Sequence, residues 1–350
     1  MIQWTRTFAG DGNAEGWYVE QTTDGGYFVV GQTTTAEHDL RTLLVKTNSS
    51  GDVTWTKILI GAGQLRAYSG QQTSDGGYIV VGEGPSEDPD RWDIYLVKID
   101  GQGNVDWLSD VSGADFWLGA RGHSIVQTSD GGYAVLGTTI LSDNAVILFK
   151  TDGLGRRQWF RRYPIEIVEA NYDRGSIRVT SDGGYIIGTR TLLKVDSQGN
   201  QQWLKTFDDV VCANSVLQTP DGGYVATGPR EDYGFIYLFK TDASGTRVWY
   251  ESNLVAGPTT GGHWVEQTAA GDYVVAGNYV TPEHDAKAIV LRATSSPIAV
   301  WTLTLFDGSA ACVRRTRDGG YIVTGERNVP SGSGTSGHMF LTKLAPDRTH

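Results

Sequence analysis

The stretch SIVQTSDGGYAVLG, residues 124–137, reads as two short strands joined by a tight turn. The runs on either side of TSDGG are rich in β-branched and aromatic residues, which favour strands. The Asp-Gly pair is typical of a hairpin turn, where glycine accepts the positive φ that other residues resist. The sequence therefore predicts strands near 122–128 and 132–138.

The same hairpin pattern recurs along the whole chain in seven copies or near-copies. The copies are QTTDGGYFVVG from Gln21, QTSDGGYIVVG from Gln72, QTSDGGYAVLG from Gln127, VTSDGGYIIG from Val179, QTPDGGYVATG from Gln218, QTAAGDYVVAG from Gln267 and RTRDGGYIVTG from Arg315. A period of roughly fifty residues indicates a repeat architecture, in which each copy is one supersecondary unit.

Each copy is followed by an apolar run ending in a basic residue, a short glycine turn and a strand with a tryptophan. Examples are YLVKIDGQGNVDW (Tyr95–Trp107) and LLKVDSQGNQQW (Leu192–Trp203). In the third unit this second half predicts strands near 145–151 and 157–163, and no window has a convincing helical period. The recurring tryptophans are Trp4, Trp55, Trp107, Trp159, Trp203, Trp249 and Trp301.

Four strands per unit, repeated seven times, predict an all-β, seven-bladed β-propeller with four antiparallel strands in each blade. The last unit lacks a tryptophan strand and the chain begins with one, IQWTRTF, so this N-terminal strand is expected to close the last blade. We expect residues 1–350 to form a single propeller domain. The predicted blades are blade 1 at about 16–60, blade 2 at about 66–111, blade 3 at about 122–163, blade 4 at about 174–208, blade 5 at about 212–254, blade 6 at about 262–306 and blade 7 at about 310–344 plus 2–8.

The aspartate of the repeated turn is interpreted as a turn residue that accepts hydrogen bonds from backbone amides. Isolated carboxylates on separate blades supply too few oxygens to hold calcium, so no metal site is predicted there. The tyrosine that follows the turn and the recurring tryptophans are interpreted as packing anchors between blades. The turn aspartates are Asp24, Asp75, Asp130, Asp182, Asp221 and Asp318.

The overall composition narrows the classes of partner. Lys plus Arg is 29 and Asp plus Glu is 40, and the net charge of −11 argues against nucleic-acid binding. No apolar run is long enough to span a membrane, and the opening MIQWTRTF does not read as a secretory signal. We therefore expect no membrane insertion. The protein is expected to be extracellular or at the cell surface if a signal peptide was removed, and otherwise cytoplasmic.

The two cysteines, Cys212 and Cys312, are too few for a disulfide framework and lack metal-ligand spacing. They are interpreted as buried thiols. The protein is expected to be a monomer, and nothing in the sequence calls for a cofactor.

The pattern QTSDGGYxVxG followed by xYLVKxDxxGNxxW resembles the repeats of bacterial and archaeal surface or secreted β-propeller proteins over essentially the whole chain. Its D-x-x-G-x-x-x-W element also resembles the tryptophan-docking motif of quinoprotein-like propellers. This second resemblance implies that tryptophans dock one blade onto the next. It does not imply a quinone cofactor, because the adjacent cysteines and eight blades common in those enzymes are missing.

Sequence variation is concentrated in the crossovers and in the loops between the second and third strands of each unit. These segments share the face opposite the uniform turns, and loops on a rigid scaffold usually carry binding and catalysis. We therefore expect the site on this loop face and at the mouth of the central channel.

Counting back from the Gln of each repeat gives equivalent positions on the innermost strands. Three residues before it, a layer of serines is broken by Tyr18, Trp264 and Cys312, whose blades adjoin once the ring closes. Four residues before it, we expect one ring of Trp17, Tyr68, His123, Gly175, Asn214, His263 and Ala311.

Aromatic and charged residues near this mouth are the expected ligand contacts. Arg174 stands in a layer of small residues, where a buried ion pair with its acidic neighbours and an anion site both remain open. His123 and His263 are read as hydrogen-bonded structural residues or as general bases. The predicted ligand-binding residues are Trp17, Tyr18, Tyr68, Trp92, Trp117, His123, Arg174, His263 and Trp264.

A metal site built from His123, His263, His38 and His284 is considered and not preferred, because imidazole ligands must converge on one ion. The two Glu-His-Asp triplets, residues 37–39 and 283–285, are interpreted as solvated loops. Trp92, Phe116 and Trp117 are either aromatic platforms for sugars, peptides or cations, or plugs that fold back onto the loops.

Three functions remain open. The preferred interpretation is a non-catalytic, carbohydrate-binding recognition module for a glycan or another surface polymer, because aromatic residues are expected at the mouth of a rigid ring. The alternatives are a protein-interaction scaffold and an enzyme, either a polysaccharide lyase or a glycoside hydrolase. For the enzyme the catalytic candidates are Arg174, Tyr172, His123 and His263.

Overall fold

The computed structural model describes residues 1–8, 12–35, 39–59, 65–85, 91–112, 119–139, 145–165, 175–210, 212–228, 236–252, 254–255, 259–281, 283, 285–331 and 334–346. These residues form 27 strands, and no helix occurs among them. The all-β prediction is confirmed for the described part of the chain. None of these residues belongs to a helix that is long and apolar enough to cross a membrane.

Five sheets have four antiparallel strands in chain order. The first is β2 (Ala14–Gln21), β3 (Tyr27–Thr34), β4 (Leu40–Thr47) and β5 (Val53–Leu59). The second is β6 (Arg66–Gln72), β7 (Tyr78–Pro85), β8 (Trp92–Ile99) and β9 (Val105–Asp110). The third is β10 (Ala120–Gln127), β11 (Tyr133–Thr139), β12 (Val146–Thr151) and β13 (Arg157–Tyr163). The fourth is β14 (Ser176–Val179), β15 (Tyr185–Gly188), β16 (Thr191–Val195) and β17 (Gln201–Thr206). The fifth is β18 (Ser215–Gln218), β19 (Tyr224–Gly228), β20 (Tyr237–Thr241) and β21 (Arg247–Glu251).

The remaining seven strands form one sheet in which a single long strand is shared by two units. Its order is β1-β27-β26-β25-β24-β23-β22. Within β25, residues 299–307 pair with β24 and residues 308–315 pair with β26. The sequence analysis expected a break at this point, but β25 continues through Gly308, whose φ is 137°. The strands are β22 (Thr259–Gln267), β23 (Tyr273–Val280), β24 (Ala286–Ala293), β25 (Ala299–Arg315), β26 (Tyr321–Ser331), β27 (Gly334–Leu344) and β1 (Ile2–Phe8).

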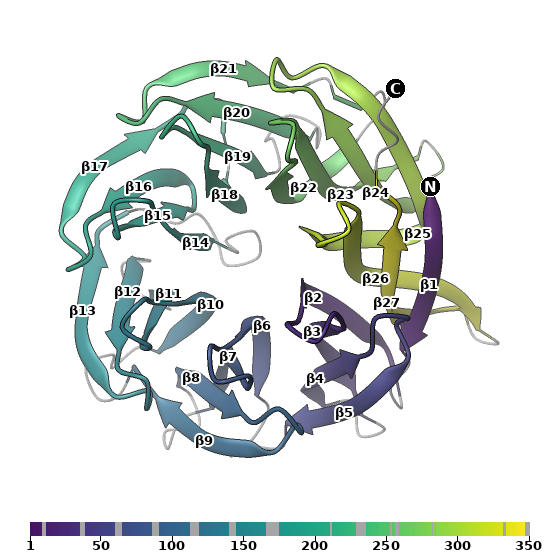
Figure 1. The fold of residues 1–350 in the computed structure, drawn as a ribbon, viewed down its shortest axis with the longest axis horizontal. Coiled ribbons are helices and arrows are strands. Elements are labelled where there is room, and N and C mark those ends of the chain that lie inside the picture. Colours follow the sequence, from purple (N-terminus) through teal and green to yellow (C-terminus); the bar gives the residue numbers. More distant parts are fainter. Residues whose placement is uncertain are drawn as a thin grey trace.

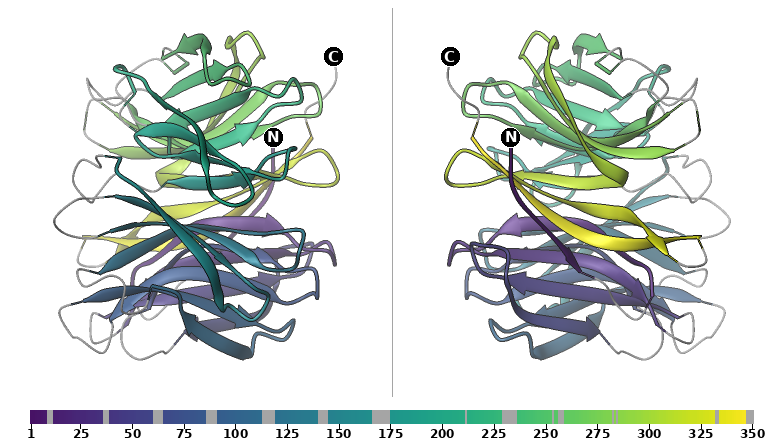
Figure 2. Two further views of the ribbon diagram at one scale, coloured as in Figure 1. Left: turned by 90° about the vertical axis from the view of Figure 1, so that its left-hand side faces the viewer. Right: turned by 90° about the vertical axis from the view of Figure 1, so that its right-hand side faces the viewer.

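We number the four-stranded groups as units 1 to 7, unit 6 ending and unit 7 beginning within β25. They are arranged around a central axis, with β2, β6, β10, β14, β18 and β22 innermost (Figure 1). The hairpin turns lie on the face toward the viewer of Figure 1, which is the right-hand side of the left view in Figure 2. We call this the turn face, and the opposite face, where the innermost strands begin, the loop face.

The core lies between neighbouring sheets, where β-branched and leucine side chains from both are buried. Ala134 and Leu136 of unit 3, for example, share one buried cluster with Ile187 and Leu193 of unit 4. Burial on both faces explains why the second and third strands of each unit read as continuous apolar runs.

Tryptophans of the outermost strands join each of several units to the next, as the docking resemblance implied. A Cβ on Gly155 would lie 2.6 Å from the ring of Trp107, so the ring packs directly on a glycine with φ 75°. The glycine belongs to the turn between the third and fourth strands of the following unit. The pairs are Trp4 with Gly51, Trp55 with Gly103, Trp107 with Gly155, Trp159 with Gly199 and Trp203 with Gly245.

The aspartate of the TSDGG turn is a structural residue. In unit 1, Asp24 accepts hydrogen bonds from the Gly26 amide (2.9 Å) and from Nζ of Lys46 (2.8 Å), a lysine buried on β4. Partial burial alone would raise the pKa of Asp24, but these bonds and one from Thr22 lower it to about 2. The turn interpretation is confirmed. The equivalent pairs, between 2.6 and 3.0 Å, are Asp24–Lys46, Asp75–Lys98, Asp130–Lys150, Asp182–Lys194, Asp221–Lys240 and Asp318–Lys343.

The first and last units are in contact. Strand β1 pairs antiparallel with β27, and Trp4 on β1 packs on Gly51 of unit 1. Nearer the axis, the backbone amide of Arg317 donates to Gln21 Oε1 (2.9 Å), and Sγ of Cys312 lies 3.8 Å from the Val19 carbonyl oxygen. Both cysteines, Cys312 and Cys212, are buried, as predicted.

Candidate functional site

The innermost strands carry a β-bulge at the position of the expected ring. The pairing register shifts between Gly16 and Tyr18 in unit 1, and equivalent shifts occur in units 2, 3, 6 and 7. A bulge leaves one residue unpaired and re-aims its side chain. The bulged residues are Trp17, Tyr68, His123, His263 and Ala311.

On the loop face, the bulged aromatic residues of units 1 and 2 meet. The ring centroids of Trp17 and Tyr68 are 6.1 Å apart, with the planes inclined by 59°. The Tyr68 hydroxyl donates to Oε1 of Glu83 on β7 (3.1 Å). Since both rings are only half-buried, this corner offers aromatic surface beside a carboxylate.

Two arginines extend this corner to a third aromatic residue. The guanidinium of Arg66 lies 4.6 Å from the ring centroid of Trp92, and Nε of Arg121 lies 3.3 Å from Oε2 of Glu83. Glu83 is 2% exposed, and its burial raises its pKa, although Arg121 and the Tyr68 hydrogen bond act in the opposite direction. We call Trp17, Arg66, Tyr68, Glu83, Trp92 and Arg121 the loop-face cluster.

The two histidines of the expected ring bond within their own sheets. Nε2 of His123 is 2.8 Å from the Thr138 hydroxyl on β11, and Nε2 of His263 is 2.9 Å from Oδ1 of Asn278 on β23. Each bond joins the bulged residue to the second strand of the same unit. The geometry supports the structural interpretation of both residues.

The serine layer links neighbouring units. The Ser176 hydroxyl accepts a hydrogen bond from the backbone amide of Val216 in the next unit (2.9 Å), and Ser124 and Ser215 do the same for their neighbours. Where the layer is broken, Tyr18 and Trp264 contact each other edge to face, with centroids 5.7 Å apart. The two residues are 5% and 9% exposed, so this contact between units 1 and 6 is buried.

A charged layer in the channel was missed by the sequence analysis. It lies one residue before the Gln of each repeat, or before Val179 and Arg315 where Gln is replaced, between the serine layer and the turn face. The signal was available, because comparing this position across the repeats would have revealed two arginines and two glutamates among uncharged residues. Its members are Glu20, Gln71, Val126, Arg178, Leu217, Glu266 and Arg314.

The charged layer packs against the two aromatic rings. Nε of Arg314 lies 3.2 Å from Oε1 of Glu266, which also accepts a hydrogen bond from the Trp264 indole (3.0 Å). The guanidinium of Arg314 is 5.9 Å from the Tyr18 ring centroid and 5.7 Å from that of Trp264. On the other side, Arg178 lies 4.5 Å from the Trp264 centroid. Arginines from units 4 and 7 therefore contact one tryptophan of unit 6.

Glu20 is bound differently from Glu266. It accepts hydrogen bonds from the Tyr18 hydroxyl (3.2 Å) and from the backbone amide of Gln72 in the next unit. Burial raises the pKa of Glu20, while the positive charge of Arg314 lowers it. Its carboxyl group is thus engaged in the contact between units 1 and 2.

Several predicted residues lie outside the described part of the chain. They are Trp117, Arg174, Tyr172, Phe116, Glu37, His38 and His284. Their proposed contacts stay predictions. Among the described residues, no group of three or more His, Cys, Asp or Glu side chains has an arrangement that could hold a metal ion.

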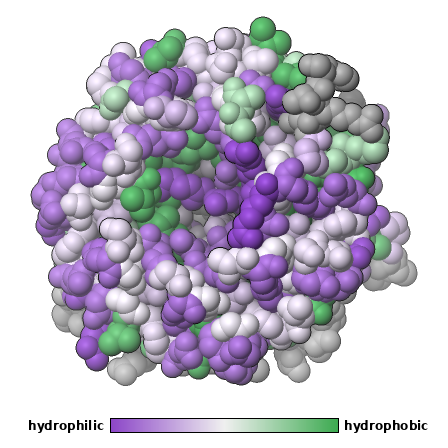
Figure 3. Space-filling model, viewed as in Figure 1, coloured by the Kyte–Doolittle hydropathy of each residue, from purple (hydrophilic) through white to green (hydrophobic). Residues whose placement is uncertain are grey.

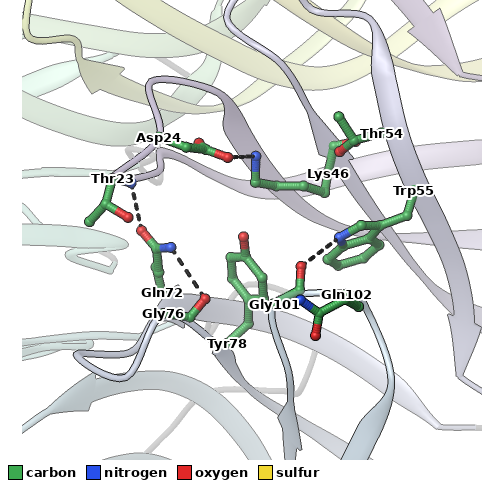
Figure 4. A pocket seen from close by; sticks show the side chains of 10 residues that line it. All are labelled: Thr23, Asp24, Lys46, Thr54, Trp55, Gln72, Gly76, Tyr78, Gly101 and Gln102. Atoms are coloured by element: carbon green, nitrogen blue, oxygen red, sulfur yellow. Dashed lines mark hydrogen bonds and ion pairs between the residues drawn. The ribbon is translucent and has the colours of Figure 1, made fainter.

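A depression of about 560 Å³ on the turn face, between units 1 and 2, is made of scaffold residues (Figure 4). The Thr23 amide donates to Gln72 Oε1 (2.7 Å), and the Trp55 indole donates to the Gly101 carbonyl (3.2 Å). The first contact recurs between other units, for example from Ser74 to Gln127. Since its walls are parts of the repeat, we place no specific site there.

Comparison with known proteins identifies the fold class. No family model matches the chain, and no curated protein matches it. The BP39L lectin from Burkholderia pseudomallei is similar in structure, with a TM-score of 0.62, 9% sequence identity and coverage of 97% of this chain and 99% of that one. A PL25 ulvan lyase bound to -[GlcA(1-4)Rha3S]- has a TM-score of 0.60, 8% identity and coverage of 97% and 96%. The Dos1 propeller has a TM-score of 0.54, 10% identity and coverage of 99% and 96%.

At such low identity these similarities show the fold alone. Together with the four-stranded antiparallel sheets around an axis, they define the chain as a β-propeller protein. Structures of this class include both a lectin and a polysaccharide lyase, so function has to be argued from the site.

Proposed function

We propose that this protein is a non-catalytic recognition module that binds a glycan or another surface polymer through the loop-face cluster. The observation that carries the proposal is the contact of Trp17 with Tyr68 beside the Arg66–Trp92 pair. Half-buried aromatic rings cover the apolar face of a sugar, and nearby charged groups bond to its hydroxyls. The lectin of the same fold is consistent with this use of a propeller.

The cluster offers both kinds of contact within one corner. The rings of Trp17 and Tyr68 are inclined by 59° and do not stack on each other, so each keeps part of a face for a ligand. Arg66 and Arg121 provide donors, and Glu83, already held by Tyr68, provides an acceptor in a fixed position. Pre-ordering of this kind reduces the entropy lost on binding.

We further propose that the chain is one domain built as a closed ring of seven blades with the predicted boundaries. The pairing of β1 with β27 and the contacts of unit 7 with unit 1 support it. A closed ring removes exposed sheet edges and holds the loop-face cluster on a rigid frame.

The catalytic alternative finds little support in the described residues of the cluster. Glu83 is the one carboxylate of the loop-face cluster, and glycoside hydrolysis normally uses a pair flanking the bond. For the lyase alternative, Arg174 and Tyr172 lie outside the described residues. The scaffold alternative stays open as an outcome of the binding experiment.

The test is binding of the labelled protein to an array of neutral and acidic glycans, followed over time. We expect a selective signal without shortening of the bound chain. Trp17→Ala and Trp92→Ala should each weaken it about fivefold to thirtyfold, because an aromatic contact of this kind contributes about 1–2 kcal/mol. Trp249→Phe, on the outermost strand β21, is the matched control and should bind normally.

Shortening of the bound glycan would favour the enzyme instead. A blank array, with a protein captured through the same face, would favour the scaffold. Either result would overturn the proposed function.

A further inference from the structure

A second candidate site lies in the channel, at the end that opens on the turn face. Arg178 is the third residue of β14 and is followed by Val179, which is 44% exposed. The Arg178 side chain is half-buried, and its Nη2 is buried without a hydrogen-bond acceptor. Nη1 makes a long bond of 3.4 Å to the Ile177 carbonyl oxygen. A guanidinium normally forms several strong bonds, so this one is poorly satisfied.

The other charged groups of the layer already have polar partners, and Glu20 accepts hydrogen bonds from the Tyr18 hydroxyl and the Gln72 amide. Arg314 is held by Glu266, and although burial alone would lower the pKa of Arg314, Glu266 and Tyr18 raise it. Burial and the positive charge of Arg314 lower the pKa of Arg178. Within the described ranges, no carboxylate lies within ion-pair distance of Arg178. Arg178 is therefore the arginine of the layer without an ion-pair partner among the described residues.

Two further arginines lie near the mouth on this side. Arg315 takes the place that glutamine has in five of the repeats, and it and Arg317 are exposed. Figure 3 shows this face, with strongly hydrophilic side chains reaching over a central hollow and apolar residues on one wall. Positive charge at the mouth of a low-dielectric channel concentrates anions there.

We propose that this end of the channel binds a small oxyanion, a carboxylate or a sulfate group, with Arg178 as its main contact. The planar guanidinium forms paired hydrogen bonds to either group, which satisfies Nη2 after a small movement of the side chain. The rings of Trp264 and Tyr18 form the apolar floor beneath the anion. The rest of the ligand extends toward the turn face, away from the loop-face cluster.

The repeat itself shows that the fold does not need an arginine at this position. Units 2, 3 and 5 have Gln71, Val126 and Leu217 there. A buried guanidinium nitrogen without an acceptor is costly, so Nη2 of Arg178 in unit 4 points to a ligand that bonds to it. It also means that Arg178→Gln introduces a side chain the same layer already contains.

The experiment is titration calorimetry of the whole protein with glucuronate, sulfate and glucose at low salt. Glucuronate or sulfate should bind and glucose should not bind at this site. Arg178→Gln should weaken anion binding about tenfold or more, the range of a charge-assisted hydrogen bond. Arg161→Gln is the matched control, because Arg161 also lies over a tryptophan, 5.2 Å from Trp159, but on the outermost strand β13. Binding of sulfate as well as glucuronate would identify a general oxyanion site, and binding of glucuronate alone a sugar-acid site.

Three results would overturn the proposal: no anion binding by the native protein, equal binding by Arg178→Gln and Arg161→Gln, or a lower melting temperature of Arg178→Gln without anion. The last result would assign Arg178 a structural role. Anion binding should persist in Trp17→Ala and Trp92→Ala, which separates this site from the loop-face proposal.

Discussion

The carboxylate of each TSDGG turn joins three parts of its sheet at once. In unit 3, Asp130 Oδ1 accepts from the Gly132 amide (3.1 Å), and Oδ2 accepts from Nζ of Lys150 (2.8 Å). Lys150 also donates to the carbonyl oxygen of Thr151 (2.8 Å). A buried lysine needs such partners, and this explains why the last residue but one of the third strand is a lysine in most units.

This pairing predicts a loss of stability in acid. Partial burial alone would raise the pKa of Asp130, but bonds from Lys150 and Thr128 lower it to about 2 from an ordinary value near 3.8. A carboxyl with a lowered folded-state pKa stabilises the fold above its unfolded pKa, and this contribution is lost as the pH falls toward 2. The free energy of unfolding should therefore decrease between about pH 4 and pH 2.

The variant Asp130→Asn measures how much one turn carboxylate contributes to this pH-dependent free energy of unfolding. At pH 7 we expect a loss of roughly 0.5 kcal/mol, because the carboxylate is more than half exposed and its charge is screened. At pH 2 the variant and the native protein should converge in urea unfolding. Lys150→Met removes the same pair from the other side, so its free energy of unfolding should fall less between pH 4 and pH 2 than that of the native protein. Parallel curves at all pH values would contradict the account.

Single residues also show which roles can be predicted from the sequence and which cannot. The role of the turn aspartates follows from their repetition, since a residue present in six units has a cause common to all. The role of Arg178 could be inferred only from its contacts in the structure. Trp264, which it contacts, is 86 positions away in the sequence and belongs to a different unit. A repeat alignment shows which residue is unusual but not which side chain it meets.

Among the elements, the strands of the third unit match their predicted ranges within about two residues. The bulges were not predicted, because a bulge is a difference in count between two paired strands and leaves no mark on either sequence alone. For the candidate site this matters, since Trp17 and Tyr68 are bulged residues. The continuity of β25 through Gly308 was missed because strand and crossover there have the same composition.

Substitution of the glycine on which a tryptophan packs tests whether this contact between neighbouring units stabilises the fold. Gly155 has φ 75° and no room for a Cβ beside Trp107, whereas Gly131 in the same unit has φ 81° and nothing within 4 Å of an added Cβ. Alanine at either position costs about 1 kcal/mol for the backbone conformation alone. Gly155→Ala should cost about 1–3 kcal/mol more, from displacement of the ring.

Urea unfolding of Gly155→Ala and Gly131→Ala would measure this difference directly. Equal free energies of unfolding of the two variants would mean that the tryptophan contact contributes nothing to stability. The expected difference would establish docking as the joint between units 2 and 3, and the same comparison applies to Gly103 with Gly76.

At the scale of the molecule, the number of units was predictable because repetition is visible in the sequence without any contact. Which face of the molecule carries which candidate site was predictable only in part. Variable loops indicated the loop face, and the cluster around Glu83 lies there. The turn face looked uniform from its turns, yet the residues just inside them differ from unit to unit and give the channel its charge.

Closure of the ring decides whether the two candidate sites share one rigid frame. The proposal of a closed ring rests on β1, which supplies the outermost strand of unit 7 and places Trp4 on Gly51. Trp203 on Gly245 is the matched contact in the interior of the chain. If the ring is closed in solution, Trp4→Ala and Trp203→Ala should each lower the free energy of unfolding by about 2 kcal/mol, since each truncates a half-buried ring. In an open or frayed ring, β1 detaches at little cost, so Trp4→Ala would be nearly neutral while Trp203→Ala stays destabilising.

Urea unfolding of the two variants distinguishes a closed ring from an open one. In addition, hydrogen exchange of the β27 amides paired with β1 should be slow in the closed ring and fast in the open one.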